Sequence, residues 1–369
     1  MAALFAALGG CGDDDGVGPA DAGAPVDSGL GIDAGSPTDA GSLDCPPPLS
    51  TPAPWTASTV LLPMDGDLRV DALQAEGTHN SYHVQPRSAP SEWQYTQAPL
   101  DEQLASQGVR AIELDVWWTP RCGRYRVYHA PVVDAVSTCD WLTDCLQVVR
   151  DWSDAHRGHQ PMFIQLEIKH VFSAATAEAE LSALDAELLS VFPADAIITP
   201  AGVRSTRASV RQALDTDGWP TLGFARGRVM FFLDNRGDAF ADAYTHGGAD
   251  LEGRVAFAPG APSDPFAAIA VLNDPVPDHD AIVAALAAHM LVRTRADSDG
   301  VEARANDTSR LTAALASGAH IISTDFPAPV TGLDYSVDIP GGMPARCNPV
   351  TAPAGCTPTD IEDPARLAP

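Results

Sequence analysis

The stretch Val109-Arg110-Ala111-Ile112-Glu113-Leu114-Asp115-Val116 decides the fold. Its aliphatic side chains form a nearly continuous run, which is typical of a strand buried on both faces of a parallel sheet. Glu113 and Asp115 are two residues apart, so they point to the same face of such a strand. Buried charges are unfavourable unless they are paired or bind a metal. The stretch therefore predicts a buried parallel strand whose carboxyl end carries a functional site.

Similar short apolar runs recur along the chain and alternate with longer helical or irregular stretches. Eight strands separated by crossovers favour a parallel sheet that closes into a barrel. An open doubly wound sheet is the alternative, but no glycine-rich phosphate loop follows the first run. We therefore predict an α/β fold, a TIM-type (β/α)8 barrel in regular or distorted form. The expected strands cover residues 70–78, 109–116, 125–129, 161–168, 228–233, 267–272, 289–293 and 319–324, and the expected helices cover 175–192, 280–288 and 309–317.

The residues before the barrel have a composition of their own. Cys11 ends the stretch Leu8-Gly9-Gly10-Cys11 behind an apolar run, which resembles a bacterial lipobox; the alternative is a chance cysteine in an apolar end. Residues 12–44 hold eight Asp, no Glu and no basic residue, so they cannot bury enough apolar surface to offset their ordering entropy. We expect a signal remnant with lipidation at Cys11 (1–11), a disordered linker (12–55), the barrel (56–335) and an irregular cysteine-containing extension (336–369).

Charge and cysteine content limit the partners and the compartment. The formal net charge is −27, from 49 acidic and 22 basic residues. This balance argues against nucleic acid, which needs clustered Lys and Arg, and against broad adhesion to anionic lipid. Apart from Cys11 there are six cysteines, an even number compatible with three disulfides, although the sequence leaves their connectivity open. We expect an extracytoplasmic protein, either lipid-anchored in the cell envelope or secreted.

Polar residues follow the ends of most expected strands, and in a barrel these ends surround one pocket. Glu113, Asp115 and Glu167 point to the same rim in this fold. With the amide oxygen of Asn80 they form an all-oxygen set that suits Ca²⁺ before Mg²⁺. Taken singly, each has a structural alternative, such as a hydrogen-bonded carboxylate pair. The other polar residues at the strand ends are His79, His129, Lys169, Asp234, Arg236, Arg293 and Arg295.

A family resemblance rests on these motifs. Residues 77–83, 112–115, 129 and 166–167 resemble the catalytic half of phosphatidylinositol-specific phospholipases C, most of all the calcium-dependent secreted bacterial type found in actinomycetes. Residues 292–297, 306–310 and 322–327 look like the same group. The resemblance therefore extends over most of the expected barrel, from about residue 70 to residue 327.

The resemblance implies a role for each matching position. His79 and His129 match the two catalytic histidines. Arg293 and Lys169 fall where the family contacts phosphate or the inositol ring, while Lys169 has the alternative of simply neutralising Glu167. Asp234, Arg236 and Arg295 are further substrate-binding candidates. The calcium ligands implied are Asn80, Glu113, Asp115 and Glu167.

The implied reaction is the cleavage of phosphatidylinositol to diacylglycerol and cyclic inositol phosphate, by attack of the inositol 2-hydroxyl on phosphorus. The expected partner is phosphatidylinositol in membranes, which a monomer would meet through transient contact with the membrane surface. One alternative is a glycerophosphodiester phosphodiesterase or a sphingomyelinase-D-like enzyme, but in those the first histidine is typically followed by Arg-Gly, whereas Asn80-Ser81 follows His79. Another is a non-catalytic lipid-binding surface lipoprotein, which would need to lack His79 or His129.

Overall fold

The computed structural model describes residues 44–173, 175–341 and 344–367. Cys11 and most of the expected linker lie outside these residues, so lipidation of Cys11 stays a prediction. Among the described residues, none of the helices has the length and apolar content that a membrane crossing requires.

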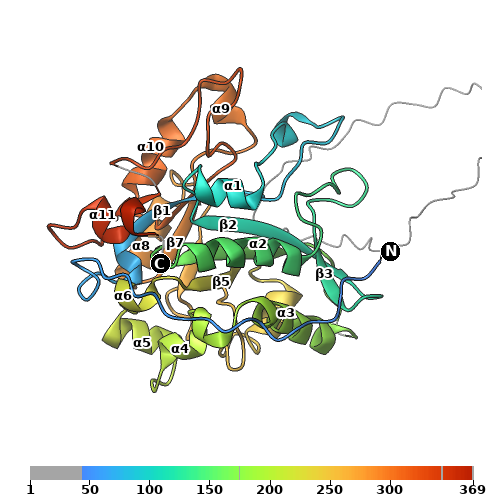
Figure 1. Cartoon of the computed structure of the whole chain (residues 1–369), viewed down its shortest axis with the longest axis horizontal. Helices are drawn as coiled ribbons and strands as arrows, with labels where there is room; N and C mark the ends of the chain where they lie inside the picture. The colour runs from blue at the N-terminus through green and yellow to red at the C-terminus, as the bar shows by residue number, and fades with distance from the viewer. Residues whose placement is uncertain (1–43, 174, 342–343, 368–369) are drawn as a thin grey trace, which may run out of the picture.

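Parallel strands form a nearly closed barrel (Figure 1). Their order around the sheet is β5-β4-β2-β1-β8-β7-β6. Single bridges from Phe257 to Phe232 and from Pro259 to Ile269 fill the gap between β5 and β6. The predicted TIM-type barrel is therefore confirmed in a distorted form. The parallel strands are β1 Leu73–Thr78, β2 Ala111–Thr119, β4 Met162–Ile168, β5 Val229–Leu233, β6 Ile269–Val271, β7 Leu291–Arg295 and β8 Ile321–Thr324.

One expected barrel strand is wrong. Residues 125–129 were expected as the third parallel strand, but β3 (Arg124–Val127) pairs antiparallel with the end of β2 and forms a hairpin. A parallel crossover needs about a dozen residues or more, and the connection between the two runs is shorter than that. The eighth position of the ring is held instead by residues 257–259, where Pro259 cannot donate a ladder hydrogen bond and weakens the strand pattern.

The helices cover the outside of the barrel. The three expected helices correspond to α3, α8 and α10 to within two residues at each end. The sequence expectations left out α2, although it buries Leu142, Leu146 and Val149 at helical spacing. The α-helices are α1 Leu100–Ala105, α2 Leu142–Ala155, α3 Ala177–Val191, α4 Pro200–Arg204, α5 Val210–Asp217, α6 Leu222–Ala225, α7 Ala239–Tyr244, α8 His279–Ala287, α9 Val301–Ala305, α10 Ser309–Ala316 and α11 Pro358–Ile361. The 3-10 helices are η1 Val70–Ala72, η2 Ser91–Trp93, η3 Ala194–Ala196 and η4 Pro364–Arg366.

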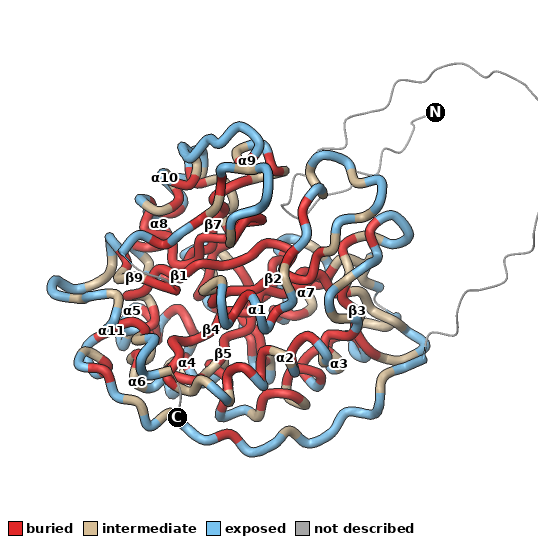
Figure 2. Tube along the Cα trace, turned by 45° about the horizontal axis from the view of Figure 1, so that its top comes forward, coloured by how far each residue is buried: buried red, intermediate tan, exposed pale blue. Residues whose placement is uncertain are grey.

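The barrel interior is layered. The part of the interior near the amino ends of the strands is apolar and includes Ala111, Phe163 and Ile321. Figure 2 shows the strands as the most continuously buried part of the molecule. A Cβ on Gly77 would lie 2.9 Å from Ala111 Cβ and 3.2 Å from Ile321 Cγ2, so only glycine allows β1 to approach its two neighbours this closely. Because side chains alternate along a strand, the next inward position of β2 is Glu113, where the polar layer begins.

The C-terminal extension packs against the barrel. It contributes β9 (Ala345–Cys347), which pairs antiparallel with β1, and the disulfide Cys347–Cys356. Glu362 accepts hydrogen bonds from Arg110, with Oε1 at 2.6 Å from Arg110 Nη2, and both side chains are buried. The sequence predicted an irregular extension, and the structure adds that it covers the amino end of β2.

Residues 45–65, which we call the strap, span the height of the barrel. At one end the disulfide Cys45–Cys122 joins the strap to the turn between β2 and β3. At the other end Trp55 Nε1 donates to Gly227 O at 3.1 Å, and Asp65 pairs with Arg226 at 2.5 Å, both just before β5. Figure 1 shows the strap in blue, running along the outside of the molecule from the hairpin towards α6. The third disulfide, Cys139–Cys145, is local.

Candidate active site

Three buried carboxylates converge on β2 and β4, towards the carboxyl end of the parallel ladder that pairs these strands. Asp115 and Glu167 lie opposite each other on these neighbouring strands. Glu113 is two residues before Asp115, so it points to the same side of the sheet. One oxygen of each of the three residues lies within 4.8 Å of the others. All three are at least 95% buried, so their mutual repulsion is not screened by water. The structure thus brings together the three acidic residues that the sequence predicted as metal ligands.

The chemistry of this cluster fits a hard cation. Neither oxygen of Asp115 accepts a hydrogen bond from the described residues, although the side chain is buried. Lys169 Nζ lies 3.4 Å from Asp115 Oδ2 without a hydrogen bond, so the burial of this carboxylate is not offset by hydrogen bonds. Asn80 follows β1 with a positive φ of 42°, and its Oδ1 accepts a hydrogen bond from Tyr82 Oη at 3.1 Å. Burial, and then the charge of Asp115, raise the pKa of Tyr82, whose hydroxyl is the group that donates to Asn80.

Basic side chains lie against the same carboxylates. Lys169 Nζ is 3.0 Å from Glu167 Oε1 and 3.4 Å from Asp115 Oδ2. Arg293 Nη2 is 2.6 Å from Glu113 Oε2, and the same guanidinium also bonds Asn273 and Ser323. Two of the predicted substrate-binding residues are therefore part of the carboxylate cluster. Lys169 forms an ion pair with Glu167, and its two sequence-based interpretations both stay predictions.

His79 is held by a carboxylate that the sequence analysis did not single out. It follows β1, and its Nδ1 lies 2.6 Å from Asp325 Oδ1 at the end of β8. Arg295 Nη2 donates to Asp325 Oδ2 at 3.1 Å, and its Nη1 lies 3.5 Å from His79 Nε2. Burial alone would raise the pKa of Asp325, but the charges of His79 and Arg295 lower it. Asp325 is therefore an ionised partner that orients the His79 ring.

His129 has a similar partner in the loop that precedes α2. Its Nδ1 lies 2.9 Å from Asp134 Oδ2, and its ring packs perpendicular to that of Trp93 at a centroid distance of 4.9 Å. The backbone nitrogen of Tyr128 donates to Asp115 O, which places His129 close to Asp115 in the middle of β2. Burial raises the pKa of Asp134, but hydrogen bonds from His129 and His83 outweigh it and lower the pKa overall.

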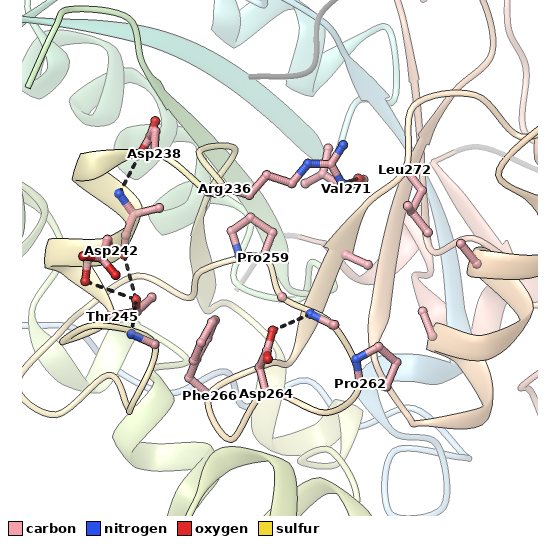
Figure 3. Close-up of a pocket in the computed structure, with 18 of the residues that line it drawn as sticks. Arg236, Asp238, Asp242, Thr245, Pro259, Pro262, Asp264, Phe266, Val271 and Leu272 are labelled. Atoms are coloured by element: carbon pink, nitrogen blue, oxygen red, sulfur yellow. Dashed lines mark hydrogen bonds between the residues drawn. The ribbon is translucent and has the colours of Figure 1, made fainter. Parts of the chain in front are cut away.

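The two remaining predicted residues lie at the end of β5. Asp234 is buried, and its Oδ1 accepts a hydrogen bond at 3.1 Å from Gln165, whose register partner on β2 is Glu113. Arg236 is exposed and donates to Val271 O at 3.1 Å. It lines a separate hollow of about 900 Å³ beside α7 and β6, shown in Figure 3. None of the three carboxylates and neither predicted catalytic histidine lines this hollow.

Asp134, Asp325, Tyr82 and His83 were missed as site residues. Asp325 follows an expected strand, so the rule that chemistry gathers at strand ends could have found it. Asp134 lies in an irregular loop without periodicity, and only its distance to His129 in the folded chain identifies it.

Comparisons with known proteins agree with this geometry. Residues 126–349 match the family described as phosphoinositide phospholipase C, Ca²⁺-dependent, a match that contains His129, Glu167 and Arg293. Among curated proteins none matches the chain.

Two solved structures share the fold. The calcium-dependent phosphoinositol-specific phospholipase C of a Pseudomonas species superposes with a TM-score of 0.56 at 18% identity, covering 77% of this chain and 97% of that one. The Ca²⁺-dependent phosphatidylinositol-specific phospholipase C of Streptomyces antibioticus superposes with a TM-score of 0.51 at 20% identity, covering 70% of this chain and 95% of that one. The family match spans more than half of the chain, and the resemblance seen in the sequence is confirmed: the chain belongs to the Ca²⁺-dependent phosphoinositide phospholipase C family.

Proposed function

We propose that this enzyme cleaves phosphatidylinositol between phosphate and diacylglycerol and releases a cyclic inositol phosphate. The observation that supports this most is the convergence of three buried carboxylates on β2 and β4, with a carboxylate-supported histidine following β1 and another following β3. In the proposed reaction the inositol 2-hydroxyl oxygen forms a bond to phosphorus and the bond from phosphorus to the glycerol oxygen breaks. Because nucleophile and phosphate belong to one molecule, proximity already favours this step.

The calcium site would be built from Glu113, Asp115, Glu167 and the amide oxygen of Asn80. When bound, Ca²⁺ supplies Lewis-acid stabilisation of the charge that develops on the attacking hydroxyl and the phosphate. A carboxylate of the cluster accepts the hydroxyl proton. Lys169 and Arg293, which pair with these carboxylates, bring positive charge to the same position and favour an anionic phosphate.

The histidines have separate tasks in this proposal. His129 gives its Nε2 proton to the leaving glycerol oxygen, because its Nδ1 is engaged with Asp134. His79 Nε2 lies beside Arg295, so the two side chains are suited to bind a phosphoryl oxygen. Asp325 holds the His79 ring from the opposite nitrogen.

Access to the membrane is supported by apolar residues near His129. Val132, Val133 and Val136 lie in the loop between His129 and α2 and are 96%, 60% and 58% exposed. We propose that this loop makes the transient membrane contact expected from the sequence. The three disulfides indicate an extracytoplasmic protein.

The test is release of inositol phosphates from phosphatidylinositol vesicles with and without EGTA. We expect activity to be lost on chelation and restored by Ca²⁺ but not efficiently by Zn²⁺, because the ligands are all oxygen donors. Asp115→Asn should raise the calcium concentration needed for half-maximal activity, whereas Asp280→Asn, at an exposed carboxylate on α8, should not. Full activity after exhaustive chelation would contradict the proposed site.

A further inference from the structure

A single carboxylate oxygen is shared by two histidines. Asp134 Oδ2 lies 2.9 Å from His129 Nδ1 and also 2.9 Å from His83 Nε2. His83 and Asp134 are each 1% exposed, and His129 is 6% exposed. Of these three side chains, only His129 transfers a proton in the proposed reaction; Asp134 enters it as the partner of His129 Nδ1, and His83 has no part in it.

The direction of each hydrogen bond follows from its partners. His83 Nδ1 faces the carbonyl oxygen of Tyr95 at 3.0 Å, and a carbonyl can only accept. The Asp134 carboxylate likewise accepts from His83 Nε2 and from His129 Nδ1, in agreement with the lowered pKa of Asp134. His83 therefore donates to two acceptors, Tyr95 O and Asp134 Oδ2. His129 must carry its hydrogen on Nδ1 to donate to the same Asp134 oxygen.

The backbone holds the carboxylate in place. Ala130 and Asp134 exchange two backbone hydrogen bonds, so the loop turns back directly after His129. A bridge pairs Ser137 with His83, and the disulfide Cys139–Cys145 fixes the end of the loop at the start of α2. Asp134 thus reaches His129 from a loop whose backbone is held by these contacts.

We propose that Asp134 and His83 are positioning residues for His129. Asp134 selects the ring orientation in which Nδ1–H points to the carboxylate and Nε2 points to the substrate, and His83 fixes the carboxylate oxygen that does so. This inference rests on the proposed function, in which His129 is the general acid. The competing interpretation is that Asp134 only stabilises the loop.

The experiment compares two substrates that differ in their leaving group. Phosphatidylinositol leaves a poor alkoxide that needs a proton, whereas a 4-nitrophenyl ester of inositol phosphate leaves a stable phenolate that does not. For Asp134→Asn we expect kcat on phosphatidylinositol to fall roughly 10- to 100-fold, a part of the 10²–10⁴-fold that a general acid typically contributes. On the nitrophenyl ester we expect a loss of less than about threefold, since acid catalysis contributes little there.

A double variant tests whether Asp134 acts through His129. Adding Asp134→Asn to His129→Ala should cause no further loss on phosphatidylinositol, because the ring to be positioned is gone. His83→Gln should show the same substrate difference with a smaller loss, and it carries the comparison if Asp134→Asn does not fold. Asp140→Asn, at an exposed carboxylate of the same loop, is the matched control and should leave both activities unchanged.

Each contrary result has a distinct meaning. Equal losses on both substrates, or a further loss in the double variant, would overturn the positioning role and leave a structural one. If His129→Ala itself affects both substrates equally, the proposed acid role is wrong and this inference falls with it. Thermal unfolding midpoints of all variants show whether the loop remains folded.

Discussion

At the scale of single residues, the site consists of buried carboxylates that are paired with basic side chains. Lys169, the only lysine in the chain, contacts two of the three carboxylates, and Arg293 contacts the third. These basic side chains stabilise the carboxylates, and they also compete with any cation that the carboxylates bind. We therefore expect the calcium affinity of the proposed site to depend on residues that are not calcium ligands.

Lys169 offers a test of this balance. Lys169→Met removes the charge next to Glu167 and Asp115, so we expect the calcium concentration for half-maximal activity to fall roughly two- to fivefold, in line with about 0.5–1 kcal/mol for a partly exposed ion pair. Lys169→Arg keeps the charge and should leave the calcium dependence nearly unchanged. A loss of turnover in the Arg variant would identify a substrate contact, because lysine and arginine differ in reach and shape. Identical calcium dependence of the Met variant and the wild type would contradict the competition.

At the scale of elements, buried histidines join the strands at the amino end of the barrel. His320 Nδ1 accepts a hydrogen bond from the backbone of Val292 on β7 at 3.0 Å, and its Nε2 lies 3.1 Å from Asp71 O in η1. Only the neutral ring with its hydrogen on Nε2 satisfies both partners. The side chain therefore connects β7, β8 and η1 only while it remains unprotonated.

This arrangement predicts a loss of stability in acid. Burial lowers the pKa of His320 from 6.5 to about 4, so the unfolded chain binds a proton more readily than the folded one. Stability is complete above pH 6.5 and is lost as the pH falls towards 4, by about 3 kcal/mol for this group. His320→Gln should flatten the pH dependence of the unfolding free energy across this window, whereas His279→Gln, at an exposed histidine, should not. An unchanged slope in His320→Gln would show that other groups, such as His159, dominate.

Elements also show how far the sequence could predict the fold and the site. The strand β5 is a continuous apolar run, and only Gln165 and Glu167 interrupt the apolar run of β4, so the composition of these segments was sufficient to predict the strands. The strand β3 has the same local pattern as a barrel strand, and only the short connection to β2 decides its direction. Asp134 was missed because it lies in an irregular loop, where no periodic pattern marks its contact with His129. Asp325 follows an expected strand, but its role comes from a contact across the fold to His79 that the sequence alone does not show.

At the scale of the whole molecule, segments from both ends of the chain close the amino end of the barrel. Arg226 pairs with Asp65 of the strap and donates to the backbone of Asp360 and Ile361 in the C-terminal extension. Arg110 and Glu362 form a second buried pair there. The barrel is therefore stabilised by residues that lie outside its own strands, far from the catalytic end.

The disulfides of the strap and of the C-terminal extension close loops of different length. Cys45–Cys122 spans 77 residues and Cys347–Cys356 spans 9. In the chain-entropy description, loss of the longer loop should cost about 2 kcal/mol more unfolding free energy than loss of the shorter one. We expect Cys45→Ser with Cys122→Ser to lower the urea midpoint more than Cys347→Ser with Cys356→Ser, while kcat stays the same in the first pair. Equal shifts would mean that strain or residual unfolded structure, rather than loop length, sets the effect.

The attachment of the strap to the hairpin also determines how the protein responds to tension. A force applied through the residues before Cys45 passes across the covalent bond to Cys122, at the tip of the β2–β3 hairpin. The hydrogen bonds that hold Trp55 and Asp65 lie beyond that junction and do not have to resist the pull. Without the disulfide, the same force would peel the strap away one contact at a time and reach Arg226 last. The bond therefore separates mechanical stress at the start of the chain from the interactions that keep the far end of the barrel closed.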